Sequence, residues 1–236
     1  MIRFDTISIS SKVLFICLIF GLVFTGCNTE DHMNPVEYVN PFIGTGATGN
    51  NFPTGNTFPG ATRPFGMVQL SPDNGAMGVK NYYYGKKSIV GFSHTHLSGT
   101  GPGTWVKYAN ILFMPTVGPV QTDPGQEGSP DEGYRSRYSH DREEASPGYY
   151  KVVLDDYDVE VELTATQRAG MHRYKFPSTE EGHIIIDITP YPTNGRRGPA
   201  NIKVIGDNQL AGSTTILERE GNIPFTWYFY AEFNKP

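Results

Sequence analysis

The strongest constraint on the fold is a series of short segments in which apolar and polar side chains alternate. In residues 159–164, Val159, Val161 and Leu163 are separated by polar residues. Successive side chains of a strand point to opposite faces, so this period of two predicts an antiparallel strand buried on one face. The pattern recurs near the C-terminal end, where the apolar positions are Phe225, Trp227, Phe229, Ala231 and Phe233. No window of helical length shows a convincing period of 3.6 residues.

Strand-like segments follow one another at short intervals along the chain. Besides the two above, they cover residues 65–70, 89–92, 111–114, 171–176, 184–188, 202–205 and 209–212. The last two flank Gly206-Asp207-Asn208, a sequence typical of a hairpin turn. Turn formers are abundant, with 27 glycines and 18 prolines among 236 residues. We therefore predict an all-β fold, a large antiparallel β-sandwich of the supersandwich kind, with long loops rich in glycine and proline.

The N-terminal segment has the organisation of a secretion signal. Arg3 and Lys12 precede the apolar run 13–24, which is too short to span a membrane comfortably. Thr25-Gly26-Cys27 follows, and a small residue before a cysteine at this point resembles a bacterial lipoprotein signal. An ordinary cleaved signal with an incidental cysteine is the alternative.

This organisation predicts three parts. Residues 1–26 would be the signal peptide, 27–35 a tether and 36–236 the β-sandwich. Lipidation of Cys27 would anchor the protein in the bacterial cell envelope, at the periplasm or the outer-membrane surface. Because the alternation near the C-terminal end leaves a long apolar edge strand, we expect the sandwich to be the first part of a longer protein.

Cysteine content and charge exclude several classes of function. Cys17 lies within the predicted signal, so the mature chain would have no thiol beyond Cys27. Disulfides, thiol catalysis and cysteine-based metal sites are therefore excluded. The net charge of −5 offers no basic surface, so nucleic acid is not an expected partner. The pattern G-x-G-x-x-G at residues 44–49 is followed by prolines rather than a helix, and is accidental.

The stretch 89–104 carries candidate binding residues. An apolar strand leads into His94 and His96, and glycines that include Gly99 and Gly101 then prevent a regular element. If the strand continues through His96, both imidazoles lie on one face. They could bond sugar hydroxyls, since a neutral imidazole donates one hydrogen bond and accepts another. Structural histidines bonded to loop backbone are the alternative.

A metal at the two histidines would need a third ligand. Asp73 and His172 are the available residues, and the spacing supports neither. Residues Tyr82, Tyr83 and Tyr84 offer flat rings with polar tips, which suits stacking on a sugar. The alternative for the tyrosines is a strand with aromatic cross-strand pairs, in which Tyr83 would face away from its neighbours.

Four separate strings resemble the N-terminal domain of glycoside hydrolase family 92. They are VNPFIGTG (39–46), TFPGATRPFGMVQLSPD (57–73), GFSHTHLSGTG (91–101) and YSHDREEASPGYY (138–150). Members of this family are mainly exo-acting, calcium-dependent, inverting α-mannosidases that act on N-glycans and other mannans. In their architecture an N-terminal β-sandwich packs on a larger (α/α)6 domain. The resemblance implies that this chain is the sandwich.

The resemblance also implies which domain supplies the catalytic residues and which supplies part of the sugar pocket. The family's catalytic carboxylates and calcium ligands belong to the (α/α)6 domain, so we expect neither a catalytic residue nor a metal site in this chain. The sandwich would supply a sugar-pocket wall, for which we name His94, His96, Tyr83, Gly99 and Gly101. Many members carry W-x-W-C-S-G-Y-H-Y where residues 77–84 read MGVKNYYY, with Tyr83 at the histidine position. The departure leaves the linkage preference open.

Adjacent Glu143 and Glu144 do not have the separation of a glycosidase carboxylate pair. We expect them to lie in a solvated loop. The function implied by the resemblance is the pocket-forming domain of an exo-α-mannosidase of glycoprotein catabolism, inactive without the catalytic domain. The alternative is a non-catalytic carbohydrate-binding lipoprotein with a β-sandwich fold.

Overall fold

The computed structural model describes residues 34–48, 52–53, 55, 57–75, 81–98, 110–129, 131–189, 196–217 and 224–235. The chain divides into two compact units, Met1–Pro35 and Val36–Pro236, and every strand among the described residues lies in the second. The predicted signal peptide, Cys27, Gly99 and Gly101 lie outside the described residues. Within these residues, helical structure is confined to two short 3-10 helices, η1 (Pro35–Tyr38) and η2 (His140–Arg142), and no helix could cross a membrane.

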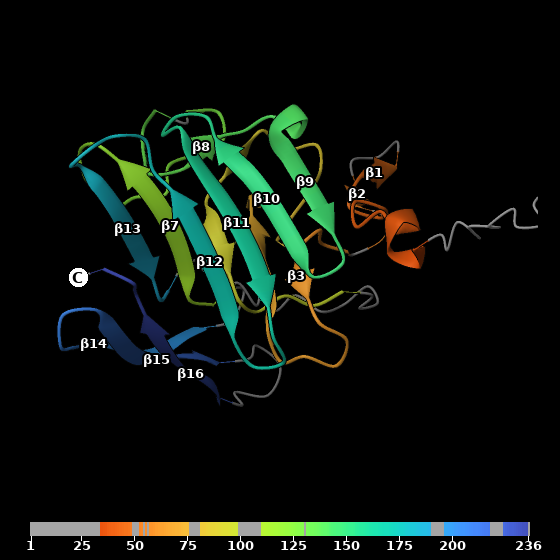
Figure 1. Ribbon diagram of the computed structural model, residues 1–236. Coiled ribbons are helices and arrows are strands. Elements are labelled where there is room, and N and C mark those ends of the chain that lie inside the picture. Colours follow the sequence, from red (N-terminus) through yellow and green to blue (C-terminus); the bar gives the residue numbers. More distant parts are fainter. Residues whose placement is uncertain are drawn as a thin grey trace, which may run out of the picture. The chain divides into compact units, whose positions relative to one another are not determined.

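Two antiparallel sheets face each other and form the body of the second unit (Figure 1). The four-stranded sheet has the order β12 (Gly170–Lys175), β11 (Val159–Ala165), β10 (Tyr149–Leu154) and β9 (Glu143–Ser146). The five-stranded sheet has the order β13 (Gly182–Asp187), β7 (Leu112–Val117), β6 (Gly91–Ser93), β4 (Gln69–Asp73) and β3 (Ala61–Thr62). This arrangement confirms the predicted all-β sandwich.

Three smaller sheets complete the unit. Two are short pairs, β1 (Ala47–Thr48) with β2 (Phe52–Pro53) and β5 (Ser88–Ile89) with β8 (Ser136–Arg137). The third contains β14 (Arg196–Ile205), β15 (Gln209–Leu217) and β16 (Pro224–Glu232). Gly206 turns the chain between β14 and β15 with φ 61°, which confirms the predicted hairpin.

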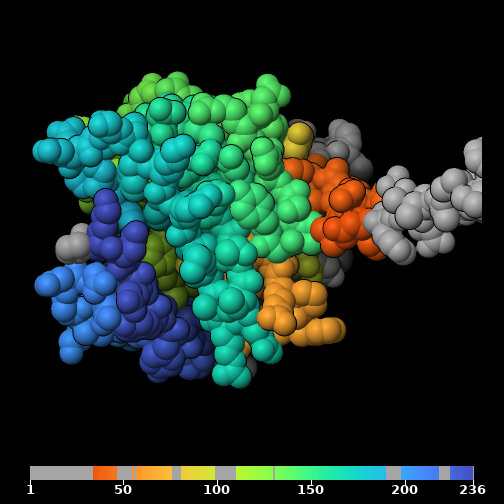
Figure 2. Space-filling view, viewed as in Figure 1, coloured from red at the N-terminus to blue at the C-terminus, as the bar shows by residue number. Residues whose placement is uncertain are grey.

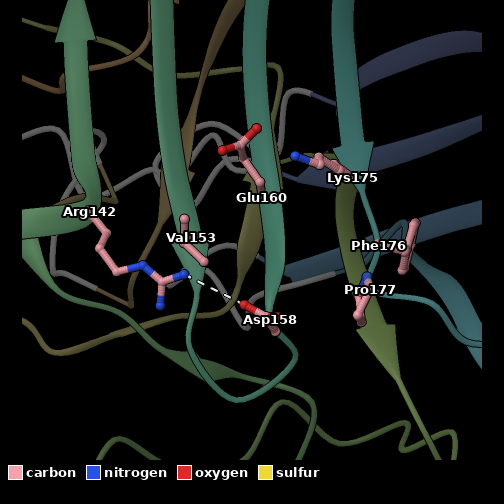
Figure 3. Close-up of a pocket in the computed structure, with 7 residues that line it drawn as sticks. All are labelled: Arg142, Val153, Asp158, Glu160, Lys175, Phe176 and Pro177. Atoms are coloured by element: carbon pink, nitrogen blue, oxygen red, sulfur yellow. Dashed lines mark ion pairs between the residues drawn. The ribbon is translucent and has the colours of Figure 1, made fainter.

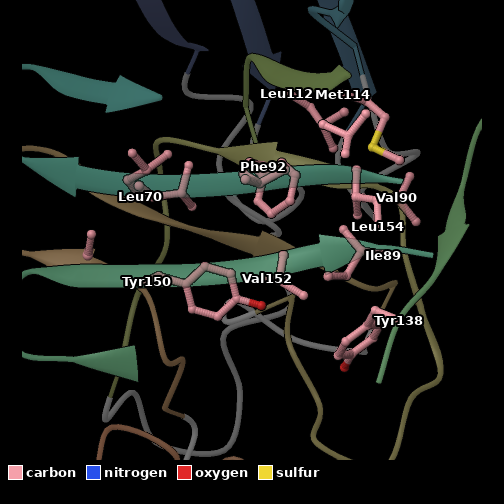
Figure 4. Packing of buried hydrophobic residues seen from close by; sticks show 14 of the residues in the cluster. Leu70, Ile89, Val90, Phe92, Leu112, Met114, Tyr138, Tyr150, Val152 and Leu154 are labelled. Atoms are coloured by element: carbon pink, nitrogen blue, oxygen red, sulfur yellow. The ribbon is translucent and has the colours of Figure 1, made fainter. Parts of the chain in front are cut away.

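The core forms because alternation turns one set of side chains from each strand inward. The register of β10 and β11 places three buried pairs on one face: Tyr150 with Leu163, Val152 with Val161, and Leu154 with Val159. Leu70 of β4 and Phe92 of β6 join this cluster from the five-stranded sheet (Figure 4). Full burial of one such aliphatic or Phe side chain stabilises a fold by about 1.5–3 kcal/mol. Apolar packing between the sheets therefore provides most of the stability.

The outer face of the four-stranded sheet is polar. The side chains of β9–β12 cover this face of the molecule in Figure 2. Lys151 pairs with Glu160, and Arg173 pairs with Glu162. Such ion pairs are screened by solvent and contribute little to stability. The alternation in residues 159–164 thus separates an apolar inner face from a charged outer face.

Two strand predictions were wrong at their ends. Residues 65–68 are not a strand, because Phe65 adopts φ 59° and the N–H of Gly66 donates to the carbonyl of Arg63, closing a turn. The segment that begins at Ile89 is also interrupted, and β6 ends at Ser93 rather than continuing to the histidines.

Gly60 is a point where a side chain would not fit. An added Cβ would lie 2.1 Å from the carbonyl oxygen of Leu70 and 2.5 Å from Cβ of Ser71. Gly60→Ala should therefore lower the free energy of unfolding by about 1–3 kcal/mol, because two backbone segments must separate. Gly128→Ala is the control, since its Cβ would have nothing within 4 Å. Urea unfolding followed by circular dichroism measures both, and equal stabilities would contradict the close approach.

Candidate functional site

A buried histidine–aspartate pair lies at the end of strand β4. Nε2 of His96 is 3.1 Å from Oδ1 of Asp73, and neither side chain is exposed. Nδ1 of the same imidazole lies 2.7 Å from the carbonyl oxygen of Gln69. The ring also packs against Phe58 at a centroid distance of 5.1 Å. Both ring nitrogens therefore face acceptors, which fixes the orientation of the imidazole.

His94 has a different environment, between the two sheets. Its Nε2 lies 3.0 Å from Nε2 of His172 in β12, and its Nδ1 lies 3.4 Å from the carbonyl oxygen of Ile111. The hydroxyl of Tyr174 lies 2.8 Å from Nδ1 of His172. A consistent chain of donors runs from Tyr174 to His172, from His172 to His94 and from His94 to Ile111. In this chain each imidazole carries one hydrogen and is neutral.

Burial determines the charge of these two histidines. It lowers the pKa of His94 to about 4 and the pKa of His172 well below its usual value, and a neighbouring imidazole adds to each effect, His96 for His94 and His94 for His172. The pair is therefore uncharged at neutral pH.

The prediction that His94 and His96 share one face depended on a continuing strand, and it is wrong. Because β6 ends at Ser93, the alternation rule does not extend to the histidines. One ring enters the space between the sheets and the other bonds to Asp73. These contacts favour the alternative of structural histidines, while a sugar-binding role remains a prediction.

Residues 82–84, the tyrosine segment, are hydrogen-bonded to Asn74, the residue that follows β4. The side-chain amide of Asn74 bonds to the backbone of Tyr83 on both sides, with Oδ1 3.1 Å from the N–H nitrogen and Nδ2 2.8 Å from the carbonyl oxygen. Tyr82 is fully buried, Tyr83 is half-buried and Tyr84 is exposed. The three residues lie outside strands, so the predicted alternative of aromatic cross-strand pairs is wrong.

Glu143 is the buried carboxylate of this region. It accepts hydrogen bonds from the hydroxyls of Tyr82, at 2.9 Å, and Tyr150, at 2.6 Å, and from Nδ1 of His140, at 2.5 Å. Burial is the main cause that raises the pKa of both phenols, with the negative charge of Glu143 adding to it, so they remain donors.

The expectation that Glu143 lies in a solvated loop is wrong. Glu143 begins β9, opposite Val152 of β10, and its side chain is 1% exposed. Of the two adjacent glutamates, Glu144 is the exposed one. No local pattern indicates this burial, because the partners Tyr82 and Glu143 are 61 residues apart.

The structure therefore bonds two of the predicted wall residues to the same end of β4 and turns a third elsewhere. His96 and Tyr83 are held by consecutive residues, Asp73 and Asn74, whereas His94 turns toward the opposite sheet. Sequence reasoning missed Asn74, His140 and Glu143 as the groups that hold the tyrosine segment.

The described residues do not fit a metal ion. No group of three or more His, Cys, Asp or Glu side chains in this part of the chain is arranged to hold one. Calcium prefers six to eight oxygen ligands, and the Asp73–His96 pair does not offer that set.

A small pocket lies on the outer face of the four-stranded sheet (Figure 3). Its volume is about 180 Å³, and it is lined by Arg142, Val153, Asp158, Glu160, Lys175, Phe176 and Pro177. Arg142 lies 3.6 Å from Asp158, and Glu160 is paired with Lys151. Most of the charges around this pocket therefore have partners.

The fold defines the class of the chain as an antiparallel β-sandwich domain, and comparison with known proteins defines the family. The profile of the Glycosyl hydrolase family 92 N-terminal domain matches residues 38–236. The chain belongs to that family.

Solved structures agree with this assignment. The chain is 39% identical to a GH92 α-mannosidase from Bacteroides thetaiotaomicron, with a TM-score of 0.76 over 85% of this chain and 26% of that one. The complex of that enzyme with mannoimidazole gives 39% identity and a TM-score of 0.75, over 85% and 25%. An uncharacterized secreted glycosidase from Arthroderma benhamiae is 27% identical over 180 residues, 73% of this chain and 22% of that protein. The chain spans about a quarter of the length of these relatives.

The histidine pair between the sheets predicts a loss of stability in acid. In the unfolded chain the imidazole of His94 has its ordinary pKa of 6.5, whereas in the folded chain its pKa is about 4. As pH falls from 6.5 to 4 the unfolded state takes up protons that the folded state does not. The free energy of unfolding should therefore fall by roughly 3 kcal/mol from His94 alone.

Urea unfolding at pH 7.5 and pH 4.5 measures this loss. The double variant His94→Leu/His172→Leu should show a smaller difference between the two pH values, because it has no buried imidazole pair to charge. His183→Gln, in β13, is the control and should retain the wild-type difference. An unchanged difference in the double variant would contradict the assignment.

Proposed function

We propose that this chain is the non-catalytic, pocket-forming domain of an exo-α-mannosidase that hydrolyses terminal α-mannosides of N-glycans or mannans with inversion. The observation that carries the proposal is membership of family 92 with 39% identity to an α-mannosidase over 85% of the chain. One of the related structures is a complex with mannoimidazole. Further support comes from the convergence of His96 and Tyr83 on the end of β4.

The chain's own residues would bind and orient the sugar rather than transform it. Tyr83 combines a flat apolar ring with a hydroxyl, and it is half-buried, so part of its surface is open to a ligand. His96 and Asp73 have no exposed surface, and their part would be to fix the end of β4. Gly99 and Gly101, which lie outside the described residues, would complete the wall.

Hydrolysis with inversion needs two carboxylates about 6.5–9.5 Å apart, one to protonate the leaving oxygen and one to activate water. Glu143 is unsuited to either task, because three donors already occupy its oxygens. We assign both carboxylates to a C-terminal (α/α)6 domain of the same polypeptide. Calcium bound in that domain would help to hold and distort the sugar. No step of the reaction is assigned to this chain.

The cellular location is part of the proposal. Lipidation at Cys27 would anchor the enzyme to the bacterial envelope, and the secreted relative supports export. The second candidate function is a lipid-anchored carbohydrate-binding module without catalysis, which is favoured by the lack of an available carboxylate pair among the described residues.

Expression of the 236-residue chain and of the complete open reading frame separates the two candidates. With an aryl α-mannoside, the longer protein should show calcium-dependent turnover that EDTA removes, and the 236-residue chain should show none. Turnover by the 236-residue chain would contradict the assignment of both catalytic carboxylates to the C-terminal domain. Saturable binding of methyl α-mannoside with no continuing catalytic frame would favour the binding module.

Tyr83→Ala in the complete enzyme should raise KM for the α-mannoside by about tenfold, because one stacking and hydrogen-bonding side chain is lost. Tyr149→Phe is the control, since that tyrosine bonds to Glu162 on the outer face of β10 and should leave KM unchanged. Steady-state kinetics measures both. An unchanged KM in Tyr83→Ala would remove Tyr83 from the wall.

A further inference from the structure

The tyrosine segment, residues 82–84, lies outside the sheets, and side chains supply much of what holds it, alongside a backbone bond from the N–H of Tyr84 to the carbonyl of Thr45. Tyr83 lies between β4 and β5 and belongs to neither strand. Its N–H and carbonyl group both bond to the amide of Asn74, at 3.1 Å and 2.8 Å. This amide takes the place of the neighbouring strand, because it offers one acceptor and one donor to a single residue.

A second contact holds the next residue. Nε2 of His140 lies 2.7 Å from the carbonyl oxygen of Tyr84, and Nδ1 lies 2.5 Å from Glu143. Both ring nitrogens of His140 therefore point at acceptor oxygens, one on the backbone of Tyr84 and one on the buried carboxylate. The ring also stacks on Tyr84 with a centroid distance of 3.8 Å and an interplanar angle of 5°.

Glu143 connects these contacts to the core. It bonds directly to the hydroxyls of Tyr82 and Tyr150, and Tyr150 is fully buried between the sheets. The carboxylate thus fixes residue 82 directly and residue 84 through His140. Removal of His140 would leave a buried charge with one donor fewer, which is costly.

The ring of Tyr83 lies against Gly85, in the space that a side chain at position 85 would fill. A Cβ at this position would lie 2.6 Å from Cε1 and 2.9 Å from the hydroxyl oxygen of Tyr83. No positive φ constrains Gly85, so alanine is compatible with its backbone. A methyl group there would displace the ring and leave the backbone contacts of Asn74 and His140 intact.

We propose that Asn74, His140 and Glu143 are positioning residues that set the place of Tyr83 in the sugar-pocket wall. The inference rests on the proposed function for the identity of the ligand, a terminal α-mannoside. It assigns no contact with the sugar to the three residues themselves. They act through the backbone of residues 82–84, and the phenol of Tyr83 is the group that meets the ligand.

The order of Tyr83 can be tested without sugar. In the 236-residue chain labelled with 3-fluorotyrosine, the fluorine resonance of Tyr83 is assigned by its loss in Tyr83→Phe. Asn74→Ala should move this resonance toward its position in urea, with the unfolding midpoint retained. Gly85→Ala should move it to a new folded position. Gly128→Ala is the matched control and should leave it in place.

Conservative variants keep this test decisive if Asn74→Ala does not fold. Asn74→Asp retains the acceptor for the N–H of Tyr83 and loses the donor, so it should give an intermediate shift. His140→Phe should also move the Tyr83 resonance, because the contacts of the imidazole with the carbonyl of Tyr84 and with Glu143 are lost. An unmoved Tyr83 resonance in Asn74→Ala or in His140→Phe would overturn the positioning role.

The link to the ligand is tested in the complete enzyme with an aryl α-mannoside. Asn74→Ala should raise KM by about tenfold, as Tyr83→Ala does, and the double variant should add nothing further because both act through one ring. Full additivity would overturn the proposal. Absence of turnover by the complete wild-type enzyme would instead contradict the proposed function, while the fluorine measurement still decides whether Asn74 and His140 hold Tyr83.

Discussion

The hydrogen bonds to the carboxylate of Glu143 are the interaction on which the candidate site depends. A carboxylate removed from water costs several kcal/mol unless donors replace the lost hydration. Two phenols and one imidazole supply them here, from three separate parts of the chain. Because the donors must converge on one point, the tyrosine segment, η2 and β10 have a single mutual arrangement. A local electrostatic requirement therefore fixes contacts between distant parts of the sequence.

The histidines His94, His96, His140 and His172 have two different kinds of hydrogen-bond partner. His96 and His140 each place both ring nitrogens against acceptors, one of them a carboxylate. His94 and His172 face each other, and only one of two neighbouring nitrogens can carry the shared hydrogen. The lowered pKa values of His94 and His172 keep this second pair uncharged at neutral pH. The same side chain thus links a carboxylate to the backbone in one place and bridges two sheets in another.

Sequence reasoning predicted the fold well because alternation is a local property. Val159, Val161 and Leu163 needed no knowledge of distant residues to be assigned to the inner face of β11, and Gly206 marked its hairpin directly. The polar contacts could not be predicted in this way. Glu143 lies in a run of charged residues, and only its tertiary partners explain its burial. The end of β6 at Ser93 likewise follows from tertiary contacts of the histidines.

Residues 82–84 follow no strand register, and this independence has a consequence for how the domain can change. In a sheet, a one-residue insertion moves every following side chain to the opposite face. A segment held by an amide and an imidazole imposes no such penalty on its neighbours. Its residues can be exchanged while the sandwich keeps its pairing, so a common scaffold can present different rings to different ligands. An exchange of ring at residues 82–84 therefore requires no change in the pairing of any described strand.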